Sequence, residues 1–492
     1  MATAEYPELM PVLAELFLAI IGMALLIFGV FQKGGRNEQD LPTFRYANLL
    51  SVAALLLTTL LTSMLAGERL LTFNDMFISD GFSGFCKILV LLASAGSLIV
   101  AKGFLERHGL ARFEFPVLVI FATLGMLMMI SANDMIALYL GLEMQSLSLY
   151  IIAAFQRDDP RSTEAGLKYF VLGAVASGML LYGISLVYGF SGTTNFDTIA
   201  RMLSEPYLED PGNGIVFGIV FILAGLAFKI SAVPFHMWAP DVYEGAPTPV
   251  TAFFAIAPKI AALALLMRVM LGPFGNLVEQ WQQIVIFISV ASMFLGSFAA
   301  VNQRNIKRLM AYSSIGHVGY ALIGLSLGSE PGARAILIYL TIYLVMNIGT
   351  FSCILCMRRG GRMVERIDDL AGLGKTHPMV ALALAIFMFS MAGIPPLAGF
   401  FGKLYIFQAA IAAQFYTIAI IGVLTSVVSA FYYLRIIRII YFDDVQDPLD
   451  QSIDREISIM LVLTGVLIVA FIAYPEPIVS NAADAAASLF DS

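Results

Sequence analysis

Long apolar runs recur along the whole chain, separated by short charged or Pro/Gly-rich breaks. A helix needs about 20 mainly apolar residues to cross the hydrocarbon core of a bilayer, so each run predicts one membrane-spanning helix. Fourteen runs can be marked off: 10–31, 46–66, 83–101, 114–131, 134–155, 164–190, 214–234, 249–271, 281–301, 307–327, 333–357, 378–410, 413–434 and 456–474. The pattern therefore predicts an all-α polytopic membrane protein with about fourteen transmembrane helices.

The composition agrees with this prediction over all 492 residues. Hydrophobic residues make up 59% of the chain and charged residues 13%, whereas soluble domains have about 45–50% and about 25%. A water-soluble globule is thereby excluded. A nucleic-acid partner is also excluded, because 28 basic against 35 acidic residues provide no basic face for phosphates. Three cysteines are too few for a four-ligand zinc site, so we expect no metal.

Basic residues alternate between the expected loops. With the N-terminus outside, the inner loops hold 19 basic residues and the outer loops hold 3. Short cytoplasmic loops are rich in lysine and arginine, so this asymmetry predicts fourteen helices with both termini on the outer side. The six remaining basic residues fall within or at the ends of the expected helices: Lys87, Lys168, Lys229, Lys259, Arg268 and Lys403.

A charge at mid-bilayer costs roughly 2.5–3.5 kcal/mol, so each of these six needs a physical reason. Three of them, Lys87, Lys168 and Arg268, lie in the first or last turns of their runs. Long basic side chains at such positions can reach the lipid headgroups, and we expect these three to do so.

The other three lysines lie deeper or beside helix breaks, and the acidic residue Glu143 lies ten residues into the fifth run. One glutamate cannot neutralise Lys229, Lys259 and Lys403 together, which argues against purely structural ion pairs. Burial lowers the proton affinity of a lysine and raises that of a glutamate, so such a set is suited to a proton relay. His317 in the tenth run could extend it, because a neutral imidazole both donates and accepts.

Prolines interrupt two of the expected helices. Pro234 ends the seventh run, and Pro395 with Pro396 interrupts the twelfth, which is 33 residues long. Proline removes a backbone donor, so both helices should be discontinuous, and unwound backbone at membrane depth commonly borders an ion path.

Because the broken helices are five apart, they run in opposite directions and suit two inverted five-helix repeats. We accordingly divide the chain into three N-terminal helices, a first repeat of helices 4–8, a second repeat of helices 9–13, and a last helix with its tail: 1–113, 114–271, 272–434 and 435–492. The longest loops have about twenty residues, too few for a flavin, dinucleotide or iron–sulfur domain. Redox chemistry would therefore belong to other chains.

Three long motifs carry a resemblance to a known family. Residues 228–253 read FKISAVPFHMWAPDVYEGAPTPVTAF and are followed by Ala257-Pro258-Lys259; residues 389–403 read FSMAGIPPLAGFFGK, and residues 308–317 read RLMAYSSIGH. These segments closely resemble the antiporter-like membrane subunits of respiratory complex I, and the match covers most of the chain. The resemblance implies a proton-translocating subunit in a bacterial inner (plasma) membrane, which would make the outer side periplasmic.

The resemblance also implies a role for each matched residue. Glu143 would tune the proton affinity of Lys229, which would accept a proton from the cytoplasm. Lys259 would pass it laterally with the help of His317, and Lys403 would release it to the outside.

Two further residues in the first motif, His236 and Asp241, could shape the inner opening beside the break, although a turn-forming role is equally consistent with the sequence. Lys168 is a further candidate for the site, set against the headgroup contact expected above.

The family resemblance places NADH, FMN, iron–sulfur clusters and quinone in other subunits, with no cofactor on this chain. Its partners would be the other membrane subunits, a peripheral redox arm and the lipid bilayer. Two alternatives from other classes stay open: a cation/proton antiporter without redox coupling, and a structural membrane subunit whose lysines fix helix register. A relative that takes electrons from ferredoxin also stays open, because nothing in the chain identifies the electron donor.

Overall fold

The computed structural model describes residues 8–32, 40–65, 67–204, 212–445 and 447–490. The first half of this part of the chain contains these elements: η1 (Met10–Val12), α1 (Leu13–Phe31), α2 (Asp40–Leu65), β1 (Leu70–Thr72), β2 (Phe77–Ser79), α3 (Gly81–Arg107), α4 (Glu114–Ile130), α5 (Met135–Ala153), α6 (Pro160–Ser191), α7 (Phe196–Ser204), α8 (Asn213–Lys229), α9 (Trp238–Gly245) and α10 (Thr248–Leu271).

The second half continues with η2 (Gly275–Leu277), α11 (Val278–Val301), α12 (Ile306–Ser326), α13 (Glu330–Leu355), β3 (Arg358–Arg359), β4 (Arg362–Met363), η3 (Ile367–Leu370), α14 (Leu373–Thr376), α15 (Pro378–Ala392), α16 (Ala398–Ala412), α17 (Tyr416–Phe442), α18 (Arg455–Ala470) and α19 (Glu476–Ala487).

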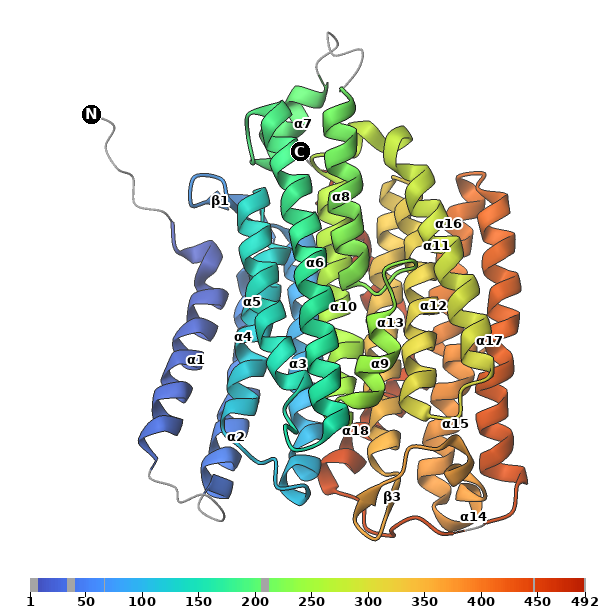
Figure 1. The fold of residues 1–492 in the computed structure, drawn as a ribbon. Coiled ribbons are helices and arrows are strands. Elements are labelled where there is room, and N and C mark those ends of the chain that lie inside the picture. Colours follow the sequence, from blue (N-terminus) through green and yellow to red (C-terminus); the bar gives the residue numbers. More distant parts are fainter. Residues whose placement is uncertain (1–7, 33–39, 66, 205–211, 446, 491–492) are drawn as a thin grey trace.

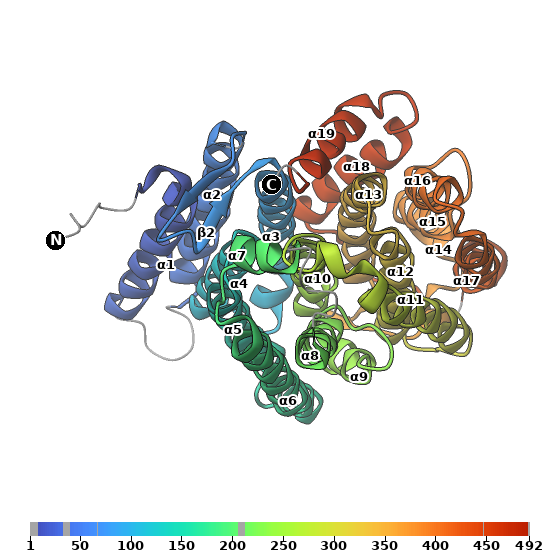
Figure 2. The ribbon, with the colours of Figure 1, turned by 90° about the horizontal axis from the view of Figure 1, so that it is seen from above.

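The long helices form one bundle with roughly parallel axes (Figure 1). Seen along these axes, α1 and α17 lie at opposite edges, and α10 and α12 lie between them (Figure 2). Every residue of α10 is buried, so this helix forms the centre of the core. Within the described residues, nine helices are long and apolar enough to cross a membrane, and four shorter apolar helices accompany them. The expectation of an all-helical membrane protein is confirmed.

The two ends of the bundle carry different small elements. The antiparallel hairpin β1–β2 and helix α7 lie at the upper end of Figure 1, and the hairpin β3–β4 and α14 lie at the lower end. We call these the β1 end and the β3 end. Glu8 and Ser488 both contact residues at the β1 end, since Thr72 Oγ1 donates to Glu8 O and Phe82 N donates to Ser488 Oγ. Residues 1–7 and 491–492, and with them the expected positions of both termini, lie outside the described residues, as do Lys33 and Arg36 among the expected inner-loop bases.

Local sequence signals explain several helix starts. Asp80 accepts from Ser83 N at 2.7 Å and caps α3, Asp134 accepts from Ile136 N at 2.7 Å and caps α5, and Asn305 accepts from Lys307 N at 2.9 Å and caps α12. Short acceptors at this position satisfy backbone donors that the first helical turn leaves free. The caps set the register in which α5 and α12 present their polar side chains to the core.

Two chain segments are discontinuous where the prolines occur. Helix α8 ends at Lys229, and α9 begins only at Trp238, so Pro234 lies in non-helical backbone. Helix α15 ends at Ala392 and α16 begins at Ala398, with Pro395 and Pro396 between them. Gly393 has φ +83°, a left-handed conformation that glycine adopts at little cost.

The C-terminal region differs from the sequence expectation. The run 456–474 predicts one helix followed by a tail, but α18 ends at Ala470 and the tail forms a further helix, α19. Helix α19 lies beside α3 and α13 in the view along the helix axes (Figure 2). Its apolar positions are small residues such as Ala482, Ala485 and Ala486, which are buried. The helix has only 12 residues and includes Glu476, Asn481 and Asp484, so a search for long apolar segments overlooks it.

Candidate functional site

Lys229 lies at the last residue of α8, against α5. Its Nζ donates to Ser146 Oγ at 2.7 Å, and its side chain is buried. Glu143 precedes Ser146 by three residues on α5 and so shares its face, but its carboxylate accepts a short hydrogen bond from Ser177 Oγ of α6 rather than pairing with Lys229. Glu143 is only partly buried. The acid and the base therefore lie in one polar region, each bonded to a different serine hydroxyl.

Lys259 lies in the middle of the fully buried α10. Its Nζ forms a short hydrogen bond with Ser314 Oγ of α12 and lies 5.4 Å from the ring centroid of Tyr243. Among the described residues, no carboxylate forms an ion pair with Lys259. A buried ammonium without a carboxylate is costly unless a relay or a change of protonation makes use of it.

His317 connects three elements of the core. Its Nδ1 is 2.5 Å from Tyr339 Oη of α13, and its Nε2 is 3.1 Å from Tyr433 Oη of α17. Tyr433 Oη is in turn 2.5 Å from Ser313 Oγ, one residue before the partner of Lys259. Each of these groups can donate and accept, so the direction of each bond can reverse when a proton moves.

Lys403 lies in the second turn of α16, beside the second break. Its Nζ donates to the carbonyl oxygens of Met391 and Ala392, each at 3.1 Å, and to Ser426 Oγ at 2.8 Å. The two carbonyls end α15, where the helix dipole places partial negative charge. The ammonium also lies 4.9 Å from the ring centroid of Tyr320. Backbone dipoles thus stabilise Lys403 in place of a carboxylate.

The remaining sequence candidates lie nearer the β3 end. Lys168 pairs with Glu164 at 2.7 Å and with Asp241 at 2.8 Å, and Asp241 also pairs with Arg308 at 2.8 Å. Lys168 is 41% exposed, so it is a surface ion-pair residue rather than a deep relay group. His236 is half-buried in the first break, and its Nδ1 has no hydrogen-bond partner among the described residues.

From their positions in the sequence, Lys87, Lys168 and Arg268 are expected to reach the lipid headgroups. This expectation is wrong for Lys87 and Arg268, and Lys168 has carboxylate partners that can stabilise its charge without a headgroup. Lys87 pairs with Glu15 of α1 at 2.6 Å, and both side chains are buried. Arg268 forms two hydrogen bonds with Asp80, at 2.8 and 2.9 Å, and is also buried. Each base lies near a helix end but is covered by a neighbouring helix whose carboxylate pairs with it. Hydropathy along one segment cannot reveal such a partner.

The site consists of two separate parts. Lys229, Ser146 and Glu143 form the first, and the second comprises Lys259 with Ser314 and, at the neighbouring residue, Ser313 with the hydrogen bonds of His317. No hydrogen bond among the described residues joins Lys229 to Lys259.

Sequence reasoning missed the hydroxyl groups that line this site: Ser146, Ser177, Ser313, Ser314, Tyr339, Ser426 and Tyr433. A signal existed for those within one turn of a marked residue. Ser146 lies three residues after Glu143, and Ser313 and Ser314 lie four and three residues before His317, so each pair shares a helix face. The tyrosines come from distant helices and have no such signal.

Comparison with known proteins places this geometry in a family. A family model described as NADH:quinone oxidoreductase/Mrp antiporter, transmembrane, matches residues 132–429, which include all five relay candidates. The curated NADH-quinone oxidoreductase subunit N of Paramagnetospirillum magneticum is 58% identical over 98% of both chains. The protein of the same name from Rhodospirillum rubrum is 57% identical over 97% of both chains.

Solved structures agree. A chain in respiratory complex I from Thermus thermophilus superposes with a TM-score of 0.80 at 31% identity, covering 96% of this chain and 99% of that one. A chain in the Mrp complex from Dietzia sp. has a TM-score of 0.83 at 23% identity, covering 97% of both chains, which shows a shared fold. The resemblance seen in the motifs is confirmed, and the chain belongs to the family of NADH-quinone oxidoreductase subunit N proteins.

Proposed function

We propose that this chain is a proton-translocating membrane subunit of an NADH:quinone oxidoreductase, in which a relay of Glu143, Lys229, Lys259, His317 and Lys403 moves the proton. The observation that carries the proposal is the set of three buried lysines that have no carboxylate partner within the described part of the chain and hydrogen-bond to hydroxyl or carbonyl groups instead. Neutral hydroxyl partners leave each lysine free to gain and lose a proton without breaking an ion pair.

The first step is proton uptake at Lys229. The break after α8 leaves backbone at membrane depth without helical hydrogen bonds, which suits a wet opening from the cytoplasm. Glu143 favours the charged form of Lys229 when its carboxylate is ionised, and this effect weakens when the charge of Glu143 changes. His236 and Asp241 lie on the chain segment that borders this opening.

The next steps are lateral transfer and release. Ahead of a proton on Lys259 lie its hydrogen bond to Ser314 and a second hydrogen-bonded set, Ser313–Tyr433–His317, which begins at the neighbouring residue of α12. In the proposed relay a water molecule links Ser314 to Ser313. Tyr320 lies between His317 and Lys403, which is held beside the second break, and in the proposed relay water carries the proton past this ring from His317 to Lys403. Release from Lys403 to the periplasmic side completes the transfer.

The assembly follows from the same proposal. NADH, FMN, iron–sulfur clusters and quinone reside in other subunits, and electron transfer there drives the relay through neighbouring membrane subunits. The chain crosses the bacterial inner membrane fourteen times, with both termini in the periplasm. Crossings 4–8 (residues 114–271) and 9–13 (residues 272–434) form two inverted repeats. The two discontinuous segments, one in each set of five, support this arrangement.

The test replaces Lys229 by alanine, and Glu143 by alanine, in the complete complex in membrane vesicles. We expect NADH-driven proton pumping to be lost while native electrophoresis shows an assembled complex that still reduces a soluble electron acceptor. Lys375→Ala is the matched control, because Lys375 is exposed and its contact with Asp444 is long at 3.5 Å. Undiminished pumping in an assembled variant would overturn the relay. Exchange driven by added sodium or potassium without NADH would instead support the antiporter alternative.

A further inference from the structure

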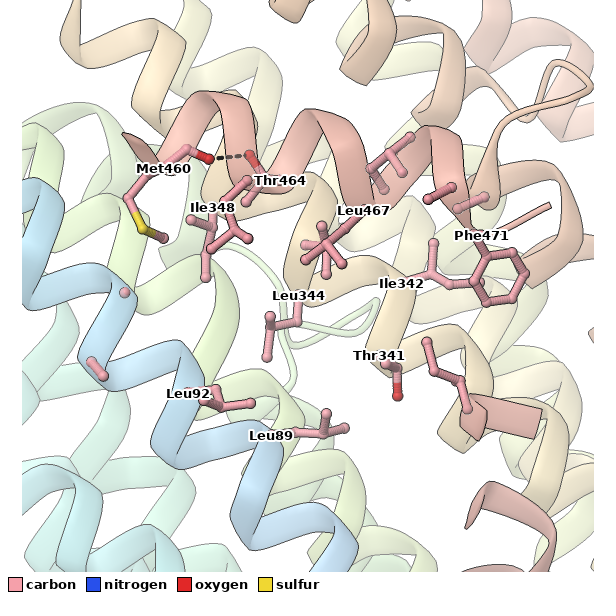
Figure 3. Close-up of a pocket in the computed structure, with 18 of the residues that line it drawn as sticks. Leu89, Leu92, Thr341, Ile342, Leu344, Ile348, Met460, Thr464, Leu467 and Phe471 are labelled. Carbon is pink, nitrogen blue, oxygen red and sulfur yellow. Dashed lines mark hydrogen bonds between the residues drawn. The ribbon is translucent and has the colours of Figure 1, made fainter. Parts of the chain in front are cut away.

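A second kind of site lies away from the relay, between α3, α13 and α18. A cavity of about 500 Å³ opens there, and the residues that border it are almost all apolar. Figure 3 shows Leu89 and Leu92 of α3, Leu344 and Ile348 of α13 and Leu467 of α18 around it.

Three hydroxyl-bearing residues border this cavity: Tyr474, which is largely exposed, and two threonines, whose hydroxyl groups are already used. Thr341 Oγ1 donates to Leu337 O at 2.9 Å, and Thr464 Oγ1 donates to Met460 O at 2.6 Å, the bond drawn in Figure 3. Water inside the cavity would find few hydrogen-bond partners, so an apolar occupant is favoured.

The cavity continues toward the β1 end and becomes polar there. A second cavity of about 680 Å³ shares Leu89, Thr341 and Ile478 with the first. Its outer part is bordered by Ser63, Asn481, Asp484 and Ser488, from α2, α19 and the residue that follows α19. We call the two cavities together the α3–α13 cleft. It combines a polar mouth at the end of the bundle with an apolar interior.

The cleft is long enough to hold a lipid of one leaflet. Along α3 it extends from Gly81 to Ile99, 18 steps of 1.5 Å or about 27 Å. One leaflet with its headgroups is about 20–23 Å thick, half of a bilayer of about 40–45 Å, so the cleft exceeds this length by a few ångströms. A spanning helix does not fit, because a single turn about 10 Å across and 5.4 Å high already fills roughly 400 Å³.

Two charges near the mouth lack ion-pair partners among the described residues. Asp484 borders the mouth cavity, whereas Arg334 borders neither cavity but lies seven residues before Thr341 on the same face of α13, about 10.5 Å nearer the β1 end. Arg334 Nε is buried without a hydrogen-bond partner, and neither Arg334 nor Asp484 forms an ion pair among the described residues. An unpaired guanidinium suits a phosphate, and an unpaired carboxylate suits an ammonium group.

We propose that the α3–α13 cleft binds one phospholipid with an ammonium headgroup, of the phosphatidylethanolamine class, in the leaflet at the β1 end. Its phosphate contacts Arg334, its ammonium group contacts Asp484, and an acyl chain fills the apolar interior. The lipid seals the contact of the three N-terminal helices with α13 and α18. A lipid whose headgroup carries only negative charge binds less well, because Asp484 at the mouth repels it and it has no ammonium group to pair with this carboxylate.

The test uses the intact complex, purified in a mild detergent, stripped of loosely held lipid, and mixed with phosphatidylethanolamine or phosphatidylglycerol. Native mass spectrometry then counts the bound lipids. We expect one tightly held phosphatidylethanolamine per complex. Arg334→Gln should lower the affinity for this lipid roughly tenfold, the effect of losing one charge-assisted hydrogen bond. Thr341→Phe, which places a ring where the two cavities meet, should displace the same lipid.

Matched controls separate this site from general lipid contact. Arg201→Gln removes an exposed arginine at the β1 end, on α7, and Leu424→Phe adds the same bulk to an exposed position on α17. Neither control should change the count. The proposal is overturned if both cleft variants keep the wild-type count, if phosphatidylglycerol binds as tightly as phosphatidylethanolamine, or if the bound lipids only mirror the lipid added. Pumping by Lys229 variants is a separate readout, so the two proposals can fail independently.

Discussion

The two helix breaks stabilise their lysines in different ways. Lys229 ends the helix that precedes the first break and has a single hydroxyl partner, Ser146, with Glu143 nearby on the same helix face. Lys403 follows the second break and is held by two carbonyls of the opposing half-helix together with Ser426. The first lysine thus has an acid nearby that we propose modulates it, whereas the second is held by fixed backbone dipoles. In the proposed relay both lysines gain and lose a proton, but only the proton affinity of Lys229 would change with the charge of a neighbouring acid.

The largest expected effect comes from Lys229→Arg and Lys403→Arg. Both variants keep the positive charge, but a guanidinium does not release its proton in a protein. Pumping should fall on the order of 100-fold at either position, the scale of a lost proton-transfer group. The pumping activity is measured as proton uptake by membrane vesicles after NADH is added, and Lys375→Arg is the control. Full pumping by either arginine variant would mean that the lysine supplies charge alone.

The backbone of the two breaks should respond in opposite directions. Gly393 has φ +83° at the second break, and Ser231 has φ +61° at the first with a buried, unpaired hydroxyl. We expect Gly393→Ala to cost about 1–2 kcal/mol and Ser231→Gly to be neutral or stabilising, because only glycine adopts this conformation freely.

Thermal unfolding of the assembled complex in detergent measures both backbone effects. Gly178→Ala is the control, since a Cβ at this position meets no neighbour within 4 Å. Equal destabilisation by Gly393→Ala and Ser231→Gly would contradict the account of the two breaks.

Removing the hydroxyl partner should matter more at the first break than at the second. Ser146→Ala deletes the only hydrogen bond of Lys229 among the described residues, whereas Ser426→Ala leaves Lys403 with two carbonyls. A net hydrogen bond is worth about 0.5–1.5 kcal/mol, so pumping should fall several-fold in Ser146→Ala and less in Ser426→Ala. The reverse order would show that the carbonyls do not hold Lys403.

The smallest effect concerns the loop that supports the start of α15. Asp450 accepts hydrogen bonds from Gly360 N and Gly361 N, each at 2.8 Å, and these bonds hold the pKa of its carboxyl below the usual value of 3.8. The same residue's carbonyl oxygen is 3.1 Å from Nε2 of His377, which precedes α15.

A lowered carboxyl pKa stabilises the folded state above pH 3.8 and ceases to do so as pH falls through the folded-state value. Asp450→Asn should therefore lower the unfolding temperature slightly at neutral pH, and the difference should shrink as the pH approaches that value. If the difference in unfolding temperature between the wild type and Asp450→Asn stayed constant with pH, the carboxylate charge would not be its cause.

Much of this protein follows from local pattern. Runs of apolar residues determine membrane helices, prolines interrupt two of them, and depth along a run identifies Lys229, Lys259 and Lys403 as unusual. These features depend on a few adjacent residues and on the lipid environment, so the sequence alone contains them. The family motifs add expected roles in proton transfer for Glu143 and His317, which the spacing of apolar residues does not predict.

Tertiary structure decided which groups meet. Lys87 pairs with Glu15, which lies 72 residues earlier in the sequence, and Arg268 pairs with Asp80, which lies 188 residues earlier. Neither base therefore needs a lipid headgroup as its partner. The hydroxyl partners of the relay, the carbonyl pair around Lys403 and the packing of α19 likewise depend on helices far apart in the chain. In a bilayer every apolar helix face can meet lipid or protein at similar cost, so the choice of neighbour comes from shape and a few polar contacts. Hydropathy reports only how strongly each residue prefers to leave water, so it does not predict which helices become neighbours.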